Sequence, residues 1–263
     1  MPEGDTIHKI AGLLEPLLVG RSLVRVTTQG LERSALAGQA VTAVRAVGKH
    51  LVIATADGSE IRTHLGMYGR WKRYAPGQAP PMSPGRASLV LATGDDVLVC
   101  TQAREVEIAD RRAPRRGVAL RRLGPDVLAD DFDPAAAAAR ARGAGHRPIG
   151  DVLLDQQVAA GIGNVYRCEV LFLEGVHPST PVAHLDDDKL VALYARARLL
   201  MSRNLGPAPR ATLPRRRLDE RGRYWVYRRA GLPCARCQAP IASRLVGEHV
   251  RRAYWCPRCQ PGV

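Results

Sequence analysis

Four cysteines near the end of the printed sequence constrain the fold more strongly than any other feature. Cys234 and Cys237 form one Cys-x-x-Cys pair, and after 18 further residues Cys256 and Cys259 form a second. Two such pairs facing each other present four thiolates in a tetrahedron, which suits Zn²⁺ at about 2.3 Å per bond. Because all four positions are then filled, we expect one zinc ion with a structural role. An iron–sulfur site is the alternative.

The segment between the two pairs is expected to form a β-hairpin, with strands at residues 241–244 and 250–255. Arg251 and Arg252 lie near the start of the second strand. Successive side chains of a strand point to opposite faces, so only one of the two arginines faces a ligand on a given side. We choose Arg251 and keep Arg252 as the alternative.

The other features of the sequence favour metal binding over disulfides for these cysteines. There is no secretory signal pattern and no run of 18 apolar residues. We therefore expect neither secretion nor membrane insertion but a reducing cytoplasm, in which disulfides are rare. Cys100 and Cys168 stand alone in apolar surroundings, and we expect both of them in the core.

The charge balance is strongly basic, with a formal net charge of +14 and a pI of about 10.2. It predicts a polyanionic partner, either nucleic acid or an anionic membrane surface. Nearly all the basic residues are Arg, and Lys occurs only at positions 9, 49, 72 and 189. Lys49 follows Gly48 in a predicted turn, where it is either a solvated turn residue or a residue that binds a ligand.

The first half of the chain has the pattern of one helix followed by short strands. The helix is expected to be capped by Asp5 or Thr6 and to end near Gly20, with apolar residues at helical spacing between them. Gly, Asp and Pro separate the β-like runs that follow, which indicates a β-sandwich or barrel. These eight runs lie at residues 23–27, 40–47, 50–55, 61–63, 69–74, 87–92, 97–101 and 106–109.

The second half is predicted to be helical. The helices are expected at residues 135–142 after an Asp133 cap, at 149–157, at 165–172 after an Asn164 cap, and at 185–202. The Gly-rich turn before Asn164 lets backbone N–H groups approach a phosphate, and a helix N-terminus favours anions. A plain N-cap is the alternative role of Asn164.

Composition marks the domain boundaries. A basic run at residues 110–122 and an acidic stretch at 130–133 indicate an interdomain linker. We therefore expect an α+β chain of two domains: a β-sandwich with a leading helix at 1–112, a linker at 113–132, and a helical domain at 133–223 that is followed by the zinc finger at 224–263. Within these parts, residues 204–223 are a loop rich in Pro and Arg, and residues 224–227 are expected to be a strand.

The first residues carry candidate catalytic groups. Removal of Met1 would leave Pro2 with a free secondary amine, and an α-amine with a pKa of roughly 7.7–8 is partly neutral and nucleophilic at neutral pH. Such an amine can attack an aldehyde-like carbon, for example C1′ of a deoxyribose, and form an iminium (Schiff base). Glu3 is next to it and can move protons. Pro after Met is common, so Pro2 and Glu3 indicate catalysis only in combination with other features of the chain.

Four stretches together resemble the formamidopyrimidine-DNA glycosylase and endonuclease VIII family. They are the start Met1-Pro2-Glu3, the runs at residues 121–126 and 155–166, and the cysteine cluster, in the family's order. The run Glu3-Gly4-Asp5 is similar to the endonuclease VIII branch, especially its actinobacterial members. The resemblance implies a N-terminal catalytic β-sandwich, a helix–two-turn–helix DNA-binding domain and a zinc finger.

The resemblance also implies an activity and its partners. Family members are bifunctional DNA glycosylases and AP lyases of base excision repair, which remove oxidised bases through a Schiff base on the N-terminal Pro, followed by β,δ-elimination. We therefore expect damaged DNA as the partner, with oxidised bases as substrates, either pyrimidines first of all or formamidopyrimidines. We also expect a monomeric bacterial protein of the cytoplasm, associated with the nucleoid.

Individual roles follow by matching positions. Lys49 and Arg251 are implied to join Pro2 and Glu3 in catalysis. Met67 matches the wedge that fills the gap left by a flipped-out base, and ordinary packing is its alternative. The remaining implied DNA contacts are His64, Arg122, Asn164 and Tyr227.

The sequence departs from the family pattern at two positions, and two alternative functions stay open. Thr6 stands where some members carry a second acidic residue, and Gly66 stands where some endonuclease VIII members carry a polar residue. The first rival is an enzyme of the formamidopyrimidine-DNA glycosylase branch that prefers 8-oxoguanine. The second is a non-catalytic zinc-ribbon protein that only binds DNA, a function for which Pro2 and Glu3 are not needed.

Overall fold

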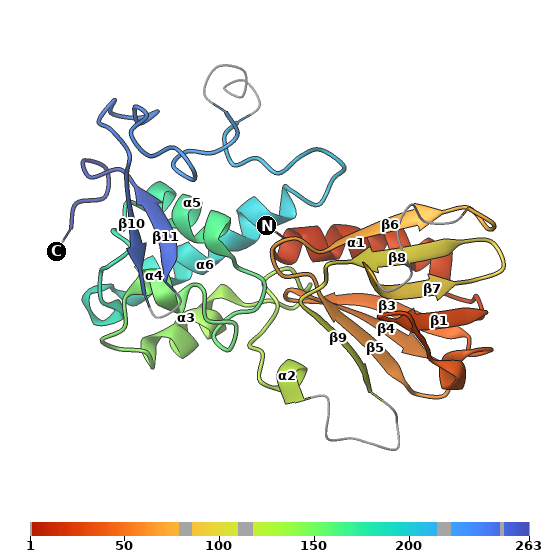
Figure 1. Cartoon of the computed structure of the whole chain (residues 1–263). Helices are drawn as coiled ribbons and strands as arrows, with labels where there is room; N and C mark the ends of the chain where they lie inside the picture. The colour runs from red at the N-terminus through yellow and green to blue at the C-terminus, as the bar shows by residue number, and fades with distance from the viewer. Residues whose placement is uncertain (1, 79–85, 110–117, 215–221, 248–249, 263) are drawn as a thin grey trace. The chain divides into compact units, whose positions relative to one another are not determined.

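The computed structural model describes the whole chain except residues 1, 79–85, 110–117, 215–221, 248–249 and 263. The chain divides into two compact units, Met1–Arg122 and Leu123–Val263 (Figure 1). The linker predicted at 113–132 straddles this division. Its residues 113–117 lie outside the described part, whereas Val127 and Phe132 are buried in the core of the second unit.

The leading helix, α1, spans Gly4–Leu18. Its buried residues Ile7, Ala11, Leu14 and Leu18 recur every three or four positions and so form one apolar face. The predicted caps were wrong, because the N-cap is Glu3. The backbone N–H groups of Thr6 and Ile7 already donate to the carbonyl of Glu3, which places Asp5 and Thr6 inside the first turn.

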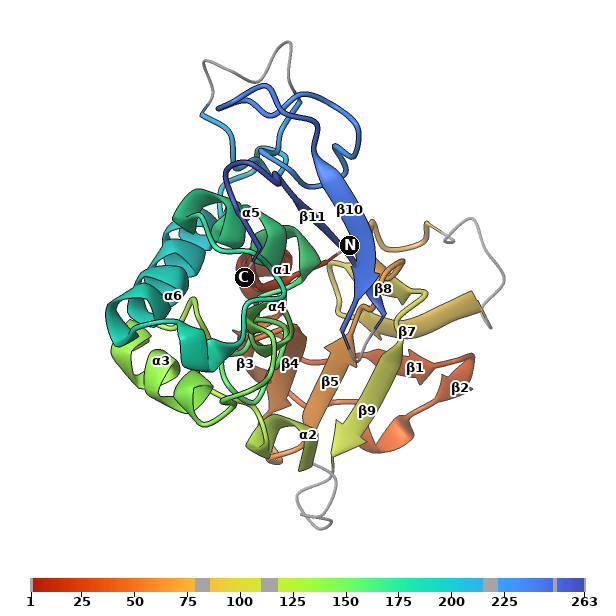
Figure 2. The same ribbon diagram turned by 90° about the vertical axis from the view of Figure 1, so that its left-hand side faces the viewer.

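The β-sandwich that follows was predicted correctly. One sheet has the strand order β2-β1-β7-β8-β6 and the other has the order β3-β4-β5-β9, with its strands side by side in Figure 2. Each predicted run overlaps a strand, and only the two-residue β2 was missed. The strands are β1 (Arg25–Thr28), β2 (Leu31–Glu32), β3 (Val41–Val47), β4 (His50–Thr55), β5 (Glu60–His64), β6 (Arg70–Tyr74), β7 (Ala87–Ala92), β8 (Val97–Thr101) and β9 (Glu105–Ala109).

The core of this unit lies between the two sheets and α1. Alternate residues of the strands, such as Leu51 and Ile53 of β4 and Leu89 and Leu91 of β7, are buried there together with Ile7 and other residues of α1. The unit also contains the short 3₁₀ helix Ser34–Leu36 and, before the division, the short helix α2 (Val118–Arg121).

The second unit is built from helices α3 (Pro134–Arg142), α4 (Ile149–Val152), α5 (Asn164–Glu174) and α6 (Asp187–Ser202), with a 3₁₀ turn at Val182–His184. The predicted Asp133 cap of α3 is confirmed, since its Oδ1 accepts from the backbone N–H of Ala135 at 2.8 Å. The predicted helix 149–157 was too long. It ends at Val152, and beyond it the side chain of Asp155 accepts from the backbone N–H of Gln157 and pairs with Arg147.

The chain ends in the predicted hairpin, whose strands β10 (Ala242–Val246) and β11 (Arg251–Trp255) pair antiparallel. The strand predicted at residues 224–227 is absent, and this described segment has no regular structure. Three of its backbone N–H groups donate to the buried Glu169 instead of to a neighbouring strand. No helix in the described parts of the chain is long and apolar enough to cross a bilayer.

Candidate functional site

One end of the β-sandwich collects several of the predicted site residues. Val47 pairs with His50 across the β3–β4 hairpin, so Gly48 and Lys49 form its tight turn, and Gly48 has a φ of +58° that favours glycine. His50 in turn pairs with His64. Because β4 starts where β5 ends, Lys49 and the loop that follows His64 lie at the same end of the sheet.

The start of α1 lies at this end as well. Gly20, just after α1, donates to the carbonyl of Val41, the first residue of β3, and α1 packs along β3 and β4. A helix of 15 residues is about 22 Å long and a strand of seven about 23 Å, so the two elements match in length. Pro2, which is half-buried, and Glu3, which is fully buried, are therefore placed toward the Lys49 turn.

The loop at residues 65–69 presents two large side chains to solvent. Met67 is 50% exposed and Tyr68 is 68% exposed, although both have apolar bodies. Gly69 allows the tight turn, because a Cβ there would lie 2.4 Å from the carbonyl oxygen of Leu65. Exposed apolar groups on a rigid loop are expected where a partner covers them. This geometry is compatible with the predicted wedge at Met67.

The structure explains why glycine occupies position 66, where some endonuclease VIII members carry a polar residue. Its φ is +62°, and a Cβ at this position would lie 2.9 Å from the Cβ of Arg104. Any side chain would therefore be strained by its backbone conformation and crowded by Arg104. The neighbouring His64 is half-buried, its ring lies 4.8 Å from that of His50, and burial lowers its pKa.

In the second unit, Asn164 lies at the start of α5 but does not cap it as predicted. The N-cap is Gly163, and Asn164 is the first helical residue. Its Nδ2 donates to the carbonyl of Arg252 at 2.9 Å, which brings the start of β11 to the N-terminus of α5. The preceding turn is held by Gln156, which accepts from the backbone of Gly161 and donates to the carbonyl of Ile162.

The two arginines at the start of β11 point to opposite faces, as expected. Arg251 is half-buried and shares its face with the buried Ala253, whereas Arg252 is exposed. The Nη1 of Arg252 donates to Oγ of Ser243 on β10 at 3.3 Å. The two arginines therefore lie on opposite faces of the hairpin, and the DNA contact of Arg251 stays a prediction.

Tyr227 is positioned by a residue that sequence reasoning missed. Glu169 on α5 is fully buried, and its carboxylate accepts from the backbone N–H groups of Trp225, Val226 and Tyr227 at 2.8–3.0 Å, and from the hydroxyl of Thr212. Burial raises the pKa of the Glu169 carboxyl, and these hydrogen bonds oppose that rise. A Glu between apolar neighbours in a predicted buried helix was the signal that could have found it.

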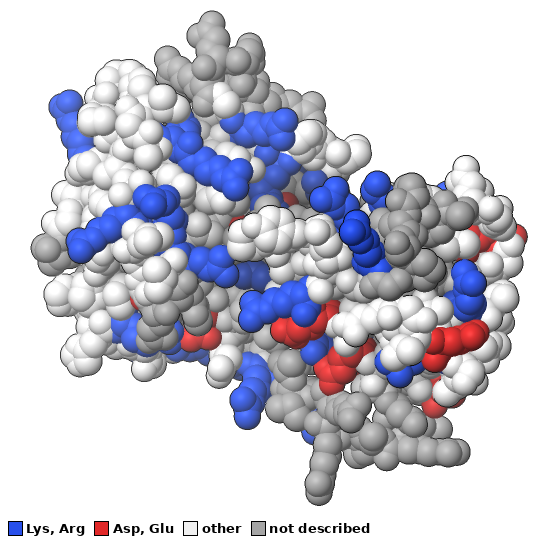
Figure 3. Space-filling model, in the orientation of Figure 1, with Lys and Arg blue, Asp and Glu red and all other residues white. Residues whose placement is uncertain are grey.

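Thr212, which donates to this carboxylate, lies within the loop that we predicted at residues 204–223. Its backbone N–H donates to the carbonyl of Arg223, the last residue of that loop, at 2.8 Å. Its residues 215–221 lie outside the described part. Arg122 is exposed at the end of the first unit. Figure 3 shows Lys and Arg side chains spread over the visible face of the second unit, with few acidic ones.

The four predicted metal ligands come together. The Sγ atoms of Cys234, Cys237, Cys256 and Cys259 all lie within 4.8 Å of one another. The distance is 3.9 Å between Cys234 and Cys259 and 3.4 Å between Cys237 and Cys256. A tetrahedral Zn–thiolate site with bonds of about 2.3 Å has sulfurs about 3.8 Å apart, so the donor set fits Zn²⁺. Four thiolates leave no open position for substrate, and a bound zinc would hold the two knuckles together.

The metal module is packed onto α5. Cys234 and Cys256 share an apolar cluster with Phe172 and Trp225. Arg236, which lies between the first two cysteines, has its guanidinium 4.6 Å from the centre of the Phe172 ring. It also donates to the carbonyls of Phe172 and Leu173 in the last turn of α5, where a positive charge is favourable.

Comparison with known proteins places the chain in a family along its whole length. The model of the formamidopyrimidine-DNA glycosylase N-terminal domain matches residues 1–115, and that of the formamidopyrimidine-DNA glycosylase H2TH domain matches residues 123–208. A Mycobacterium bovis protein named Endonuclease 8 2 is 40% identical over 99% of this chain and 100% of its own length. A Mycolicibacterium smegmatis protein named DNA-(apurinic or apyrimidinic site) lyase Nei2 is 39% identical over 99% of both chains.

Solved structures show the same fold. A Lactococcus lactis formamidopyrimidine-DNA glycosylase, non-covalently bound to DNA that contains an AP site, superposes with a TM-score of 0.81 at 22% identity. The match covers 99% of this chain and 100% of that protein.

Proposed function

Because the chain belongs to the formamidopyrimidine-DNA glycosylase and endonuclease VIII family, we propose that it is a bifunctional DNA glycosylase and AP lyase of base excision repair. The observation that carries this proposal is the position of Pro2 and Glu3 at the start of α1, toward the end of the sandwich that holds Lys49 and the Met67 loop. A protein that only binds DNA has no use for a buried carboxylate beside an N-terminal secondary amine.

The reaction starts at the amine of Pro2, once Met1 has been removed. The amine attacks C1′ of the damaged nucleotide, Glu3 donates a proton to the sugar oxygen, and the base leaves. The product is an iminium between Pro2 and the opened sugar. Its positive charge acidifies the C2′ proton, so β-elimination breaks the C3′–O bond and δ-elimination then breaks the C5′–O bond. Water hydrolyses the iminium and restores the free amine.

The other predicted residues hold the DNA. Lys49, Asn164 and Arg251 bind backbone phosphates, and Arg251 assists strand cleavage. Met67 enters the gap left by the base, because unstacking is tolerated only when another group fills the space. Arg122 and Tyr227 add backbone contacts. The affinity is expected to fall steeply with salt concentration.

Zinc has a structural role in this proposal. The four cysteines pack near α5, whose first residue is Asn164, so a bound zinc would support the contact between β11 and α5. The substrate class is oxidised pyrimidines, in accordance with the endonuclease VIII relatives. We infer that one chain acts as a monomer on the bacterial nucleoid, because the proposed site uses residues of a single chain and the substrate is chromosomal DNA.

A lesion panel tests this function. Duplexes with thymine glycol, 8-oxoguanine or an abasic site would be incubated with the zinc-loaded protein, after mass spectrometry has verified the loss of Met1. The proposal predicts base release and β,δ-cleavage products from thymine glycol and the abasic site, with Glu3→Gln strongly impaired in base release. Faster release of 8-oxoguanine would favour the formamidopyrimidine-DNA glycosylase branch. Binding without any cleavage would leave only the zinc-ribbon alternative.

A further inference from the structure

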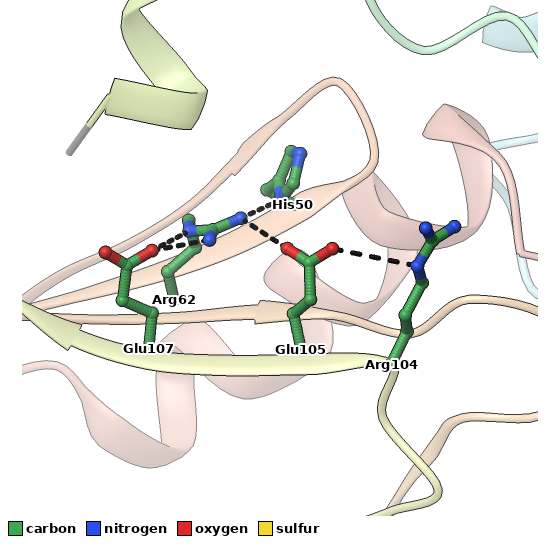
Figure 4. A network of polar contacts seen from close by, with 5 residues as sticks. All are labelled: His50, Arg62, Arg104, Glu105 and Glu107. Atoms are coloured by element: carbon green, nitrogen blue, oxygen red, sulfur yellow. Dashed lines mark hydrogen bonds and ion pairs between the residues drawn. The ribbon is translucent and has the colours of Figure 1, made fainter. Parts of the chain in front are cut away.

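A buried arginine organises the polar face of the sheet β3-β4-β5-β9. Arg62, in the middle of β5, is only 9% exposed. Its guanidinium donates to Glu107 through Nε at 3.0 Å and Nη2 at 2.5 Å, and it lies 3.3 Å from a carboxylate oxygen of Glu105 (Figure 4). Its third group, Nη1, also lies 2.8 Å from Nδ1 of His50. Each of the three guanidinium nitrogens of Arg62 therefore has a partner within the protein.

The contact with Arg62 decides the protonation of His50. A guanidinium has donors only and does not lose its proton, so Nδ1 of His50 must accept. The proton of the neutral ring then lies on Nε2. Burial, followed by the nearby charges of His64, Arg62 and Lys49, lowers the pKa of His50 to about 3. His50 is thus a neutral ring with a fixed tautomer at every pH at which DNA is normally bound.

His50 lies at the end of the sheet that holds the proposed site. His50 directly follows Lys49 and pairs with His64, after which comes the Met67 loop. The ring is half-buried, and among the residues that the structure describes none hydrogen-bonds its Nε2. Because its tautomer is fixed, the Nε2–H group of His50 is suited to donate a neutral hydrogen bond to an anion beside Lys49.

The acidic neighbours do not prevent an anion from binding here. Two carboxylates on β9 face His50, but Glu107 is held by Arg62, and Glu105 lies between Arg62 and Arg104, whose Nε is 3.7 Å away. With Lys49 in the turn, the charged groups around His50 are three cations and two carboxylates, so the local balance is positive. His64 on β5 adds a second ring, whose pKa is lowered by burial.

We propose that His50 is a further DNA-binding residue, which donates from Nε2 to a backbone phosphate oxygen beside Lys49, and that Arg62 is the positioning residue that fixes its tautomer. This inference rests on the proposed function. Under this inference, the neighbouring residues Lys49 and His50 contribute to the free energy of DNA binding in two different ways. Lys49 neutralises a phosphate and releases counterions, whereas His50 contributes a neutral hydrogen bond that releases none.

The salt dependence of DNA binding separates the contribution of Lys49 from that of His50. The probe is a duplex with a tetrahydrofuran abasic-site analogue, which is bound without cleavage, and its Kd would be measured between 50 and 300 mM salt at pH 7.5. His50→Phe should weaken binding roughly threefold to tenfold at every salt concentration and leave the slope of log Kd against log salt unchanged. His50→Gln keeps a donor and an acceptor, so it should bind nearly as the wild type does. Lys49→Gln should lower the slope by about one.

Nitrogen NMR of the ring tests the positioning role of Arg62. In the wild type, Nδ1 of His50 should resonate as an unprotonated nitrogen from pH 5 to pH 8. In Arg62→Met the pKa of His50 should rise, because one nearby positive charge is lost, and part of the His50 rings should carry the proton on Nδ1. DNA binding should then depend more on pH than it does in the wild type. A structural role alone would lower the melting temperature of this variant without moving the tautomer or the pH profile.

These experiments distinguish a failure of the His50 inference from a failure of the proposed function. Wild-type protein that neither binds the probe nor is trapped by borohydride on abasic DNA would overturn the function itself. If the wild type binds and traps but folded His50→Phe binds equally well, His50 makes no DNA contact. A proton on Nδ1 of His50 in the wild type would equally overturn the inference, since Arg62 would then not hold the tautomer.

Discussion

The side-chain amide of Asn164 donates to the carbonyl of Arg252 at 2.9 Å, across 88 residues of sequence. This bond ties the N-terminus of α5 to the start of β11, and Arg251 is the preceding residue of the same strand. The two residues that we expect to bind phosphate in the second unit are therefore held together by the fold before DNA arrives.

Asn164→Asp tests this relationship. A carboxylate cannot donate to the Arg252 carbonyl, and it would repel both that carbonyl and a phosphate. At the first position of a helix, however, a negative charge is favourable. We expect roughly tenfold to a hundredfold weaker binding of abasic-site DNA with little change in melting temperature. Unaltered binding would show that Asn164 is not a DNA contact.

Glu169→Gln tests the buried carboxylate that holds Tyr227. The amide of Gln would place its own donors against backbone N–H groups, so buried donors would lose their partners. We expect the free energy of unfolding to fall by about 2–4 kcal/mol. Glu174→Gln on the same helix is the matched control, because it weakens the ion pairs of Glu174 with Arg196 and Lys189, whose side chains are 40% and 37% exposed. Urea denaturation should show a loss of about 1 kcal/mol or less there.

Met67→Ala should impair repair without affecting stability. The side chain is half exposed, so its removal takes little from the core, but the gap in the DNA would no longer be filled. We expect kcat/KM for base release from duplex DNA to fall roughly tenfold or more. Leu13→Ala on α1 removes a side chain that is 69% exposed, and it should have no effect. Equal effects of the two variants would argue against a wedge.

Metal analysis should find one zinc ion per chain. Removal by a strong chelator should abolish DNA binding, because the hairpin that carries Arg251 depends on the four ligands. In the native protein, Cys100 and Cys168 should resist thiol reagents, since burial raises their pKa to about 12 and about 11. Iron in place of zinc, or a metal-free protein with full activity, would contradict this account.

The pH dependence of stability should report on His50. Its pKa is lowered from 6.5 to about 3 in the folded protein, so between these values the unfolded state binds a proton that the folded state does not. Stability is therefore fully present above pH 6.5 and is lost as pH falls, by up to about 1.4 kcal/mol per pH unit. His50→Gln should show a shallower slope in urea denaturation between pH 7 and pH 5. An identical slope would mean that His50 is not buried as a neutral ring.

Local patterns predicted the elements of this fold better than the contacts between them. Strand alternation and the Cys-x-x-Cys pairs depend on residues close in sequence, and both were confirmed. Arg62 and Glu169 were missed, because a charge inside an apolar run does not reveal partners that are 43–58 residues away. The strand predicted at 224–227 failed for the same reason, since Glu169 takes the N–H groups that a sheet would have used.

The helix caps show a second limit of sequence reasoning. Asp5, Thr6 and Asn164 all have side chains that favour cap positions, yet the caps are Glu3 and Gly163. Cap preferences amount to about 1 kcal/mol, which tertiary contacts easily exceed.

The central claim is that the amine of Pro2 is the nucleophile. Borohydride trapping on an abasic-site duplex, followed by digestion and peptide mass spectrometry, tests it directly. We predict that the sugar adduct is found on the nitrogen of Pro2, and that Pro2→Gly and an N-terminally extended protein trap far less. An adduct on Lys49, or no adduct from a zinc-loaded protein that has lost Met1, would contradict the mechanism.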